Sequence, residues 1–208
     1  DIVVTNPPFS LFREFMATLI RHGKKFLIIG NVNALKYKEI FPLIMGDKVW
    51  LGASIHSGDR EFGVPDDYPL EAASCRVDSR GKKYIRVKGV RWYTNLEYSS
   101  RHEKLPLYKT YSPEEYPRYV NFDAIEVSKT SDIPMDYDGQ IGVPITFMDK
   151  YNPDQFEIMG MSLELADMGI IRKRLGRNDG GPTFYLERNG KLDRLYDRIV
   201  IRHRKPAK

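Results

Sequence analysis

The first thirty residues constrain the fold most, because they alternate between two kinds of hydrophobic pattern. Residues 1–5 and 26–30 are apolar runs that are too short for helices and are typical of buried strands. Between them, residues 11–20 place apolar side chains at helical spacing, with Ser10 as the expected N-cap and Gly23 near the end. A strand–helix–strand unit predicts a parallel pair with a right-handed crossover. We therefore expect an α/β sheet.

Two asparagines follow the predicted parallel strands. Asn6 comes directly after the first strand and Asn31 directly after the second. Ligands of open α/β sheets bind beyond the carboxyl ends of the strands, so both residues are expected at the ligand-binding edge. The sequence further predicts a helix over 34–44 and a third strand over 48–53.

From about residue 54 the helical period fades, and short strands separated by turns take over. A hairpin turn at 78–81 is expected between strands at 73–77 and 83–94. Residues 97–120 are rich in Tyr, Pro and charge and are expected to form a long surface connection. This change predicts two domains, 1–95 and 96–208. The further strands expected in the second domain are 124–127, 143–148, 156–161, 183–187 and 195–202.

Composition excludes several classes of protein. The single cysteine, Cys75, cannot form an internal disulfide, which fits a reducing cytoplasm. The chain has no Cys-x-x-Cys pair, and its four histidines lack metal-ligand spacing, so no metal site is expected. No apolar run approaches the roughly twenty residues that cross a bilayer, so no membrane partner is expected.

Positive charge is concentrated at the C-terminal end. Residues 172–208 contain 12 basic and 4 acidic residues, whereas residues 1–171 contain 21 basic and 24 acidic ones. A basic end suits a polyanion, because neutralising phosphates releases counterions. A solvated basic surface is an equally good interpretation. The strongest candidates for phosphate contacts are Arg172, Lys173, Arg174 and Arg177.

The segment Asn6-Pro7-Pro8-Phe9 has the most specific chemistry in the sequence. Its two prolines fix the backbone and remove two N–H donors, which leaves carbonyl groups directed outward from a rigid turn. The Asn6 side-chain carbonyl and the Pro7 main-chain carbonyl can accept both hydrogens of an exocyclic amine. Phe9 would offer a flat surface on which a flipped base stacks. The alternative, an ordinary turn, is disfavoured by the preceding strand and the following helix.

This turn resembles motif IV of amino-methylating, S-adenosylmethionine-dependent methyltransferases. Four further stretches, at 89–96, 119–127, 142–158 and 194–201, resemble the EcoRI-type adenine-specific DNA methyltransferase family. Together with the turn they span nearly the whole chain. The resemblance implies that residues 1–95 form the C-terminal half of a Rossmann-like methyltransferase sheet. It also implies that residues 96–208 form a mostly β lobe that recognises target DNA.

The same resemblance implies a reaction, a cofactor and a partner. S-adenosylmethionine would donate a methyl group to N6 of an adenine flipped out of double-stranded DNA, in a restriction-modification or phage-modification setting. Motif IV would hold the adenine through Asn6, Pro7 and Phe9. Trp92 and Tyr93 would form an aromatic wall of the base pocket, although buried hairpin aromatics are more often plain core.

One part of the family pattern is missing. Motif I, a Phe-x-Gly-x-Gly turn that cradles the cofactor, is expected upstream and is not found in these residues. We therefore expect a fragment that binds S-adenosylmethionine weakly and methylates poorly alone, with the missing N-terminal segment supplied in trans. Two alternatives remain: a non-catalytic DNA-binding fragment, and a methyltransferase that acts on protein glutamine or RNA.

Overall fold

A computed structural model describes residues 1–55, 59–69, 75–166 and 183–207 of the 208-residue chain. The chain divides into two compact units, Asp1–Glu97 and Tyr98–Lys208, and each has its own sheets. The division falls close to residue 95, where the sequence pattern changes from crossover units to short strands. The function expected for each part remains a prediction.

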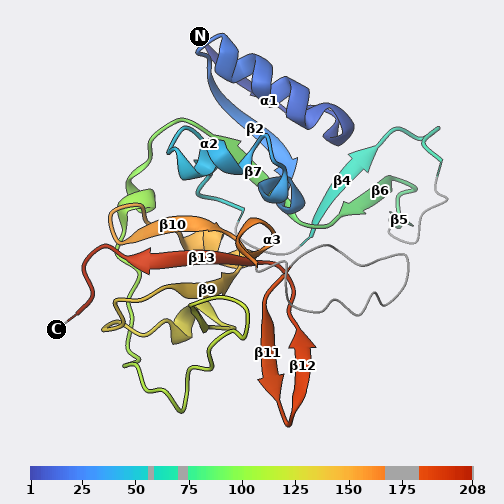
Figure 1. Ribbon diagram of the computed structural model, residues 1–208. Helices are drawn as coiled ribbons and strands as arrows, with labels where there is room; N and C mark the ends of the chain where they lie inside the picture. The colour runs from blue at the N-terminus through green and yellow to red at the C-terminus, as the bar shows by residue number, and fades with distance from the viewer. Residues whose placement is uncertain (56–58, 70–74, 167–182, 208) are drawn as a thin grey trace. The chain divides into compact units, whose positions relative to one another are not determined.

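The main sheet of the first unit has four strands in the order β1-β2-β7-β3 (Figure 1). β1 (Ile2–Thr5) and β2 (Lys25–Asn31) are parallel. β7 (Val90–Thr94) is antiparallel to both of its neighbours, β2 and β3 (Trp50–Leu51). The predicted parallel pair is therefore confirmed. The third strand is shorter than the six residues expected over 48–53.

Helix α1 (Phe12–Arg21) connects the parallel strands and packs through an apolar stripe. Phe12, Met16 and Leu19 are buried at helical spacing. The Phe12 ring meets the Tyr93 ring edge-on, with 4.9 Å between their centroids. A Cβ at Gly30 would lie 2.6 Å from the Phe12 ring, so the absence of a side chain at this position lets the helix approach the sheet.

The two ends of α1 differ in how well the sequence predicts them. The helix ends just before Gly23, which has a φ of +58° and forms the expected stop. The prediction of Ser10 as the N-cap is wrong. Ser10 lies inside a 3-10 turn, η1 (Phe9–Leu11), and Leu11 occupies the cap position without a side-chain cap. The rigid proline turn thus passes into the helix through 3-10 geometry instead of a polar cap.

β1 is not the buried strand that its apolar sequence predicts. Ile2 and Val4 have exposed fractions of 58% and 65%. The strand lies at the edge of the sheet and pairs, among the described residues, with β2 alone. Because side chains alternate across a strand, Ile2 and Val4 point to the same face, while the half-buried Val3 points to the other.

The single helix predicted over 34–44 is divided into two short helices. η2 (Val32–Lys36) is a 3-10 helix that ends at Tyr37, whose backbone is extended. α2 (Phe41–Met45) begins anew, with Pro42 in its first turn. A proline lacks the N–H that the interior of a continuous helix needs, so Pro42 is tolerated only near a helix start.

A small second sheet follows β3 in the chain and has the order β4-β6-β5. Its strands are β4 (Arg60–Val64), β5 (Cys75–Val77) and β6 (Lys83–Val87). The predicted hairpin between β5 and β6 is confirmed. The prediction of one strand over 83–94 is wrong, because Gly89, with a φ of +66°, turns the chain between β6 and β7. These two strands belong to different sheets.

The second unit contains a four-stranded sheet in the order β10-β13-β9-β8. Its strands are β8 (Ile125–Glu126), β9 (Ile141–Pro144), β10 (Phe156–Met161) and β13 (Arg198–His203). Each overlaps a predicted strand, and β10 matches its prediction over the full length. The strand expected over 143–148 is partly wrong, since the chain after Pro144 forms a 3-10 helix. The short helices of this unit are η3 (Ser99–His102), η4 (Thr130–Asp132), η5 (Ile145–Lys150) and α3 (Ser162–Leu165).

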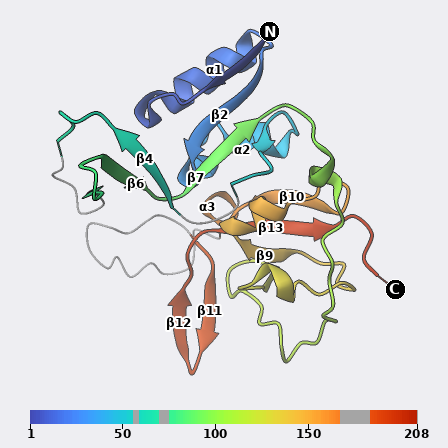
Figure 2. The ribbon, with the colours of Figure 1, turned by 180° about the vertical axis from the view of Figure 1, so that it is seen from behind.

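A two-stranded ribbon, β11 (Tyr185–Arg188) and β12 (Lys191–Arg194), precedes β13. Figures 1 and 2 both show it extending away from the sheet of its unit. Its base is held in a core cluster that includes Phe184, Leu186 and Tyr119. Tyr119 and Tyr116 are both buried, so the segment 97–120 is not wholly the surface connection that its composition predicts.

The fold is mixed α/β, with several sheets and few helices. This agrees with the predicted class at that level. The packing places the Asn6-Pro7-Pro8-Phe9 turn between a parallel edge strand and the helix that crosses to its neighbour.

Candidate functional site

The Asn6-Pro7-Pro8-Phe9 turn occupies the carboxyl end of β1. Pro7 is buried, whereas Asn6 and Pro8 are exposed. Pro8 has a φ of -55° and a ψ of 131°, and its carbonyl accepts a hydrogen bond of 2.9 Å from the Leu11 N–H. The turn is therefore fixed by one buried ring below it and by one backbone hydrogen bond to the helix that follows.

Two acceptors of this turn remain open. Within the part of the chain that the structure describes, neither the Asn6 side-chain carbonyl nor the Pro7 main-chain carbonyl receives a hydrogen bond. Asn6 is exposed, so water can solvate its side-chain carbonyl without the cost of a buried unpaired group. Phe9 follows with an exposed fraction of 36%, which leaves part of its ring accessible. The turn can thus accept an amine and offer a flat apolar surface beside it.

Asn31 stands at the same edge of the sheet, but its polar atoms are occupied. Its Oδ1 accepts from the Asn33 N–H at 2.9 Å, and its Nδ2 donates to the Lys88 carbonyl at 2.8 Å. Its main-chain carbonyl accepts from the Tyr93 hydroxyl at 2.8 Å. Asn31 therefore holds the chain around Gly89 in place, and Asn6 is the asparagine of this edge that has open acceptors.

The two aromatic residues expected at the base pocket have different surroundings. Tyr93 is fully buried, packs on Phe12 and uses its hydroxyl within the fold, so its ring is core. Trp92 points to the opposite face of the sheet and is partly exposed. Of the pair, Trp92 has surface that a base can reach.

The four cations predicted to contact phosphate, Arg172, Lys173, Arg174 and Arg177, lie outside the described residues. Their role remains a prediction from charge.

The second unit contains a buried polar cluster that the sequence did not predict. The Glu126 carboxylate receives hydrogen bonds from Arg198, with Nη2 to Oε1 at 2.8 Å, and from the Ser128 hydroxyl at 2.9 Å. The Tyr119 hydroxyl also donates to it. Exposed side-chain fractions of 10% for Arg198 and 3% for Glu126 show how thoroughly the pair is withdrawn from water. The cluster joins Glu126 and Arg198, which are 72 residues apart in the sequence. No local sequence pattern predicts a pairing over that separation.

The electrostatics of this cluster favour one protonation state. Burial, together with the Glu126 carboxylate, raises the pKa of the Tyr119 hydroxyl, so Tyr119 stays protonated and donates. Burial alone would lower the pKa of Arg198, but its hydrogen bonds to Glu126, the negative charge of Glu126 and the interaction with Tyr119 together outweigh burial, and the pKa is raised overall. A Cβ at Gly142 would lie 1.8 Å from the Tyr119 hydroxyl oxygen, so a glycine is required where that hydroxyl passes.

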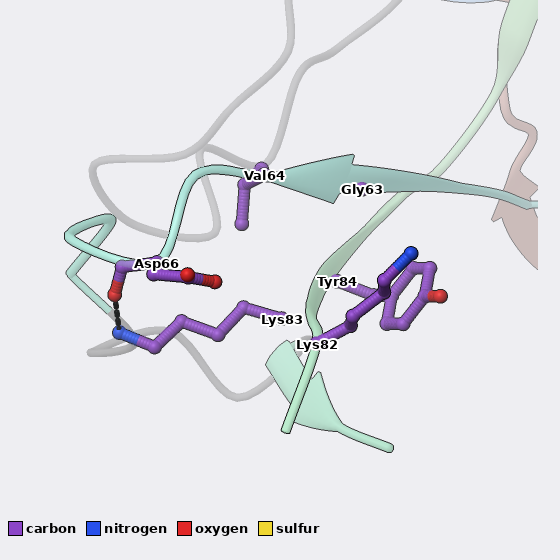
Figure 3. A pocket seen from close by; sticks show the side chains of 6 residues that line it. All are labelled: Gly63, Val64, Asp66, Lys82, Lys83 and Tyr84. Carbon is purple, nitrogen blue, oxygen red and sulfur yellow. Dashed lines mark hydrogen bonds between the residues drawn. The ribbon is translucent and has the colours of Figure 1, made fainter. Parts of the chain in front are cut away.

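A separate hollow of about 310 Å³ lies on the small β4-β6-β5 sheet (Figure 3). Lys82, Lys83 and Tyr84 line one side of it, and Asp66 lies opposite. The Lys83 ammonium donates to the Asp66 main-chain carbonyl across the opening. The hollow contains none of the residues that the sequence predicts for the site, so we do not assign it to the same function.

Comparison with known proteins identifies the family. The family model described as adenine-specific methyltransferase EcoRI matches residues 1–204. The chain belongs to this family. It is 49% identical over 186 residues to the type II methyltransferase M.EcoRI of Escherichia coli, which covers 88% of this chain and 56% of that protein. It is 37% identical over 210 residues to M.MpnI of Mycoplasma pneumoniae, with 98% of this chain and 64% of that protein covered.

A third relative, the type II methyltransferase M.MgeORF184P of Mycoplasma genitalium, is 40% identical over 164 residues, covering 76% of this chain and 51% of that protein. The chain therefore spans between about half and two thirds of the length of these curated relatives. No solved structure matches the chain. Membership of the EcoRI methyltransferase family confirms the resemblance drawn from the motif IV turn and the four further stretches.

The described residues of this family member do not by themselves provide a cradle for a nucleotide-like cofactor. Such a cradle uses a glycine-rich turn between a strand and the following helix. No described glycine with positive φ lies in a turn of that kind, since these glycines stand in hairpin turns, in a strand, after a helix or, at Gly89, between two strands.

The described ranges contain no group of three or more His, Cys, Asp or Glu side chains placed to hold a metal ion. None of their helices is long and apolar enough to cross a membrane.

Proposed function

We propose that this chain carries the adenine-binding half of a site-specific DNA adenine N6-methyltransferase of the type II, restriction-modification class. The observation that carries the proposal is the pair of open acceptors on the Asn6-Pro7-Pro8-Phe9 turn, at the carboxyl end of a parallel strand. That edge is where open α/β sheets bind ligands. The family to which the chain belongs supports adenine as the base.

The turn acts by positioning. The Asn6 Oδ1 and the Pro7 carbonyl oxygen accept the two hydrogens of the adenine N6 amine, which leaves the nitrogen lone pair directed away from the turn. Phe9 stacks on the flipped base and stabilises its extruded position, an interaction worth about 1 to 3 kcal/mol for stacked bases. The methyl donor that we propose, S-adenosylmethionine, would supply an electrophilic methyl group, and the adenine N6 would lose one proton on accepting it.

We further propose that residues 1–95 form the C-terminal half of a Rossmann-like methyltransferase sheet. The parallel β1-β2 pair and the α1 crossover support this. The exposed Ile2 and Val4 of β1 also support it, since an apolar edge strand of this kind is normally covered or paired. Residues 96–208 would then be the lobe that recognises double-stranded DNA, and a cytoplasmic location would give access to it.

The test is transfer of a labelled methyl group from S-adenosylmethionine to DNA that lacks adenine methylation. The 208-residue chain is assayed alone and within any longer polypeptide that its gene encodes. We expect N6-methyladenine from the longer polypeptide, little from the chain alone, and neither labelled RNA nor labelled protein. The Asn6→Ala variant should lose the product, whereas Asn33→Ala, at an exposed asparagine of the same unit, should keep it.

Labelling of RNA or of a protein glutamine instead of DNA would overturn the adenine assignment. DNA binding without any methyl transfer, in either form of the assay, would support a non-catalytic DNA-binding chain.

A further inference from the structure

The β11-β12 hairpin has a tightly specified turn. Asn189 and Gly190 have φ values of 53° and 71°, which is the backbone of a type I′ turn. The strands pair in register from Arg188 opposite Lys191 down to Tyr185 opposite Arg194. The pairing extends below the hairpin, because the Leu195 N–H donates to the Phe184 carbonyl at 3.1 Å. The ribbon is therefore ordered from its base to its tip.

The two faces of this ribbon differ in character. Leu186 is buried in the core of the unit, which defines the inner face. Leu192 and Arg194 lie on the other face, and Tyr196 continues the same spacing two residues farther along. Leu192 has an exposed fraction of 47% and Tyr196 one of 89%. A leucine, an arginine and a tyrosine thus lie in sequence on the outer side of β12 and of the chain after it. On the same side of β11, Glu187 lies opposite Leu192 and Tyr185 lies opposite Arg194.

The tip of the hairpin has an unfavourable arrangement of charge. Arg188 and Lys191 stand directly opposite each other, and like charges at paired positions destabilise a hairpin. Asp193 offsets this only in part, since its distance from Arg188 is 3.7 Å and both side chains are about half exposed. A polyanion lying across the tip would relieve the repulsion.

The buried Glu126 cluster holds the backbone at Tyr196, where the outer face of the ribbon ends. Arg198 Nη1 donates to the Tyr196 main-chain carbonyl at 3.2 Å, while the Arg198 Nε and Nη2 are held by Glu126. The Arg198 main-chain N–H donates to the Ser162 hydroxyl oxygen at 2.8 Å. The backbone that presents the most exposed aromatic side chain of the described residues is therefore anchored to a rigid core.

We propose that the β11-β12 hairpin enters a groove of duplex DNA. Arg188 and Lys191, which lie at the tip on the same face as Leu186, contact phosphates, and Leu192, Arg194 and Tyr196 on the outer face meet the base edges and sugars. A two-stranded ribbon fits the major groove of B-form DNA, and the outer face combines a cation with apolar surface, as such a contact requires. This inference rests on the proposed function and specifies which element of the second unit meets the DNA.

The experiment measures binding of the full 208-residue chain to a random-sequence DNA duplex by fluorescence anisotropy at several salt concentrations. In the Arg188→Gln/Lys191→Gln variant, the slope of log affinity against log salt should flatten by about 1.8, because each phosphate contact contributes about 0.9. The control, Lys129→Gln/Lys150→Gln, removes two exposed cations elsewhere in the same unit and should leave the slope unchanged.

A second pair of variants tests the outer face. Tyr196→Ala should weaken duplex binding about tenfold, equivalent to about 1.4 kcal/mol, with the salt slope unchanged. Tyr108→Ala removes a tyrosine with a comparable exposed fraction, 82%, and should have no effect. Thermal unfolding should be the same for both variants, since neither side chain is packed. Double-stranded RNA should compete weakly, because its major groove is too narrow for the ribbon.

The inference is overturned if the wild-type chain binds DNA and the hairpin variants bind as their controls do, or if double-stranded RNA competes equally. Either result leaves the proposed function standing. Absence of DNA binding by the wild-type chain would instead contradict the proposed function, and this inference with it.

Discussion

The Asn6-Pro7-Pro8-Phe9 turn and the Glu126 cluster differ in how far their hydrogen-bond acceptors are paired. In the turn, the side-chain carbonyl of the exposed Asn6 and the main-chain carbonyl of Pro7 receive no hydrogen bond within the described residues. In the cluster, both Glu126 oxygens are buried and each accepts more than one hydrogen bond. Acceptors that are left open are available to a ligand, whereas acceptors that are fully paired hold the fold together.

This contrast predicts which substitutions will affect the stability of each unit. Removing an open, exposed acceptor leaves no orphaned group behind, so stability should not depend on it. Removing one member of a buried, saturated cluster leaves a desolvated charge without its partner. The two regions should therefore respond to mutation in opposite ways, one in activity and the other in stability.

The largest expected effect is on stability. Glu126→Ala should lower the free energy of unfolding by about 3 to 5 kcal/mol, because it leaves Arg198 as an uncompensated buried cation. Urea unfolding followed by circular dichroism measures this. The double variant Glu126→Leu/Arg198→Met removes both charges and should be more stable than the single variant. If the double variant is equally unstable, packing and not charge explains the loss.

Asn6→Ala should have the complementary effect. Loss of one of the two amine acceptors should lower kcat/KM for methyl transfer about a hundredfold to a thousandfold, by analogy with the removal of one preorganised hydrogen-bonding group from an active site. The free energy of unfolding should stay within about 0.5 kcal/mol of the wild type, as for other exposed positions. Steady-state kinetics and urea unfolding of one protein preparation provide both values. A large loss of stability would break the contrast between the two regions.

Phe9→Ala should have a smaller effect on activity. The loss of stacking should cost about 1 to 3 kcal/mol in transition-state stabilisation, read from kcat/KM. Phe9→Trp keeps a flat ring at the same position and should retain most of the activity. If alanine and tryptophan variants are equally impaired, Phe9 contributes through the 3-10 turn that it begins and not through its ring.

The smallest expected effect is on the pH dependence of stability, through the buried His203 of the second unit. Burial lowers the pKa of His203 below its ordinary value of 6.5, although its hydrogen bond to the Pro134 carbonyl acts in the other direction. The unfolded state therefore binds a proton at a higher pH than the folded state does. Stability should be fully present above about pH 6.5 and should fall as the pH drops below it, by at most about 1.4 kcal/mol per pH unit. His203→Gln should reduce this dependence in thermal unfolding scans, and an unchanged profile would assign it to other groups.

Features that depend on neighbouring residues could be predicted from the sequence. The parallel pair, its crossover helix and the proline turn follow from the hydrophobic period of the first thirty residues. The β10 strand follows from an apolar run of strand length. The break at Pro42 was equally local, but the prediction of a helix over 34–44 gave more weight to apolar spacing than to the missing N–H of the proline.

Features that depend on distant partners could not be predicted in this way. The exposure of Ile2 and Val4 follows from the edge position of β1 and from the face to which they point, on which their partners Lys25 and Leu27 are not buried, and only the pairing of the strands reveals this. The Glu126–Arg198 pair links residues 72 positions apart, and a buried ion pair has no sequence period. The β12 strand, by contrast, had a local signal in Asn189-Gly190, which is a strong indicator of a hairpin.

The antiparallel pairing of β3 and β7 has a consequence for the engineering of this chain. The Gly52 N–H donates to the Trp92 carbonyl at 2.9 Å, and the chain turns at Gly89 immediately before β7. The polypeptide therefore leaves the main sheet and returns to it at adjacent points, and the β4-β6-β5 sheet is an insertion between them. A short loop or a reporter domain grafted between these glycines would test whether the main sheet folds without the insertion, and it would leave the turn that follows β1 unchanged.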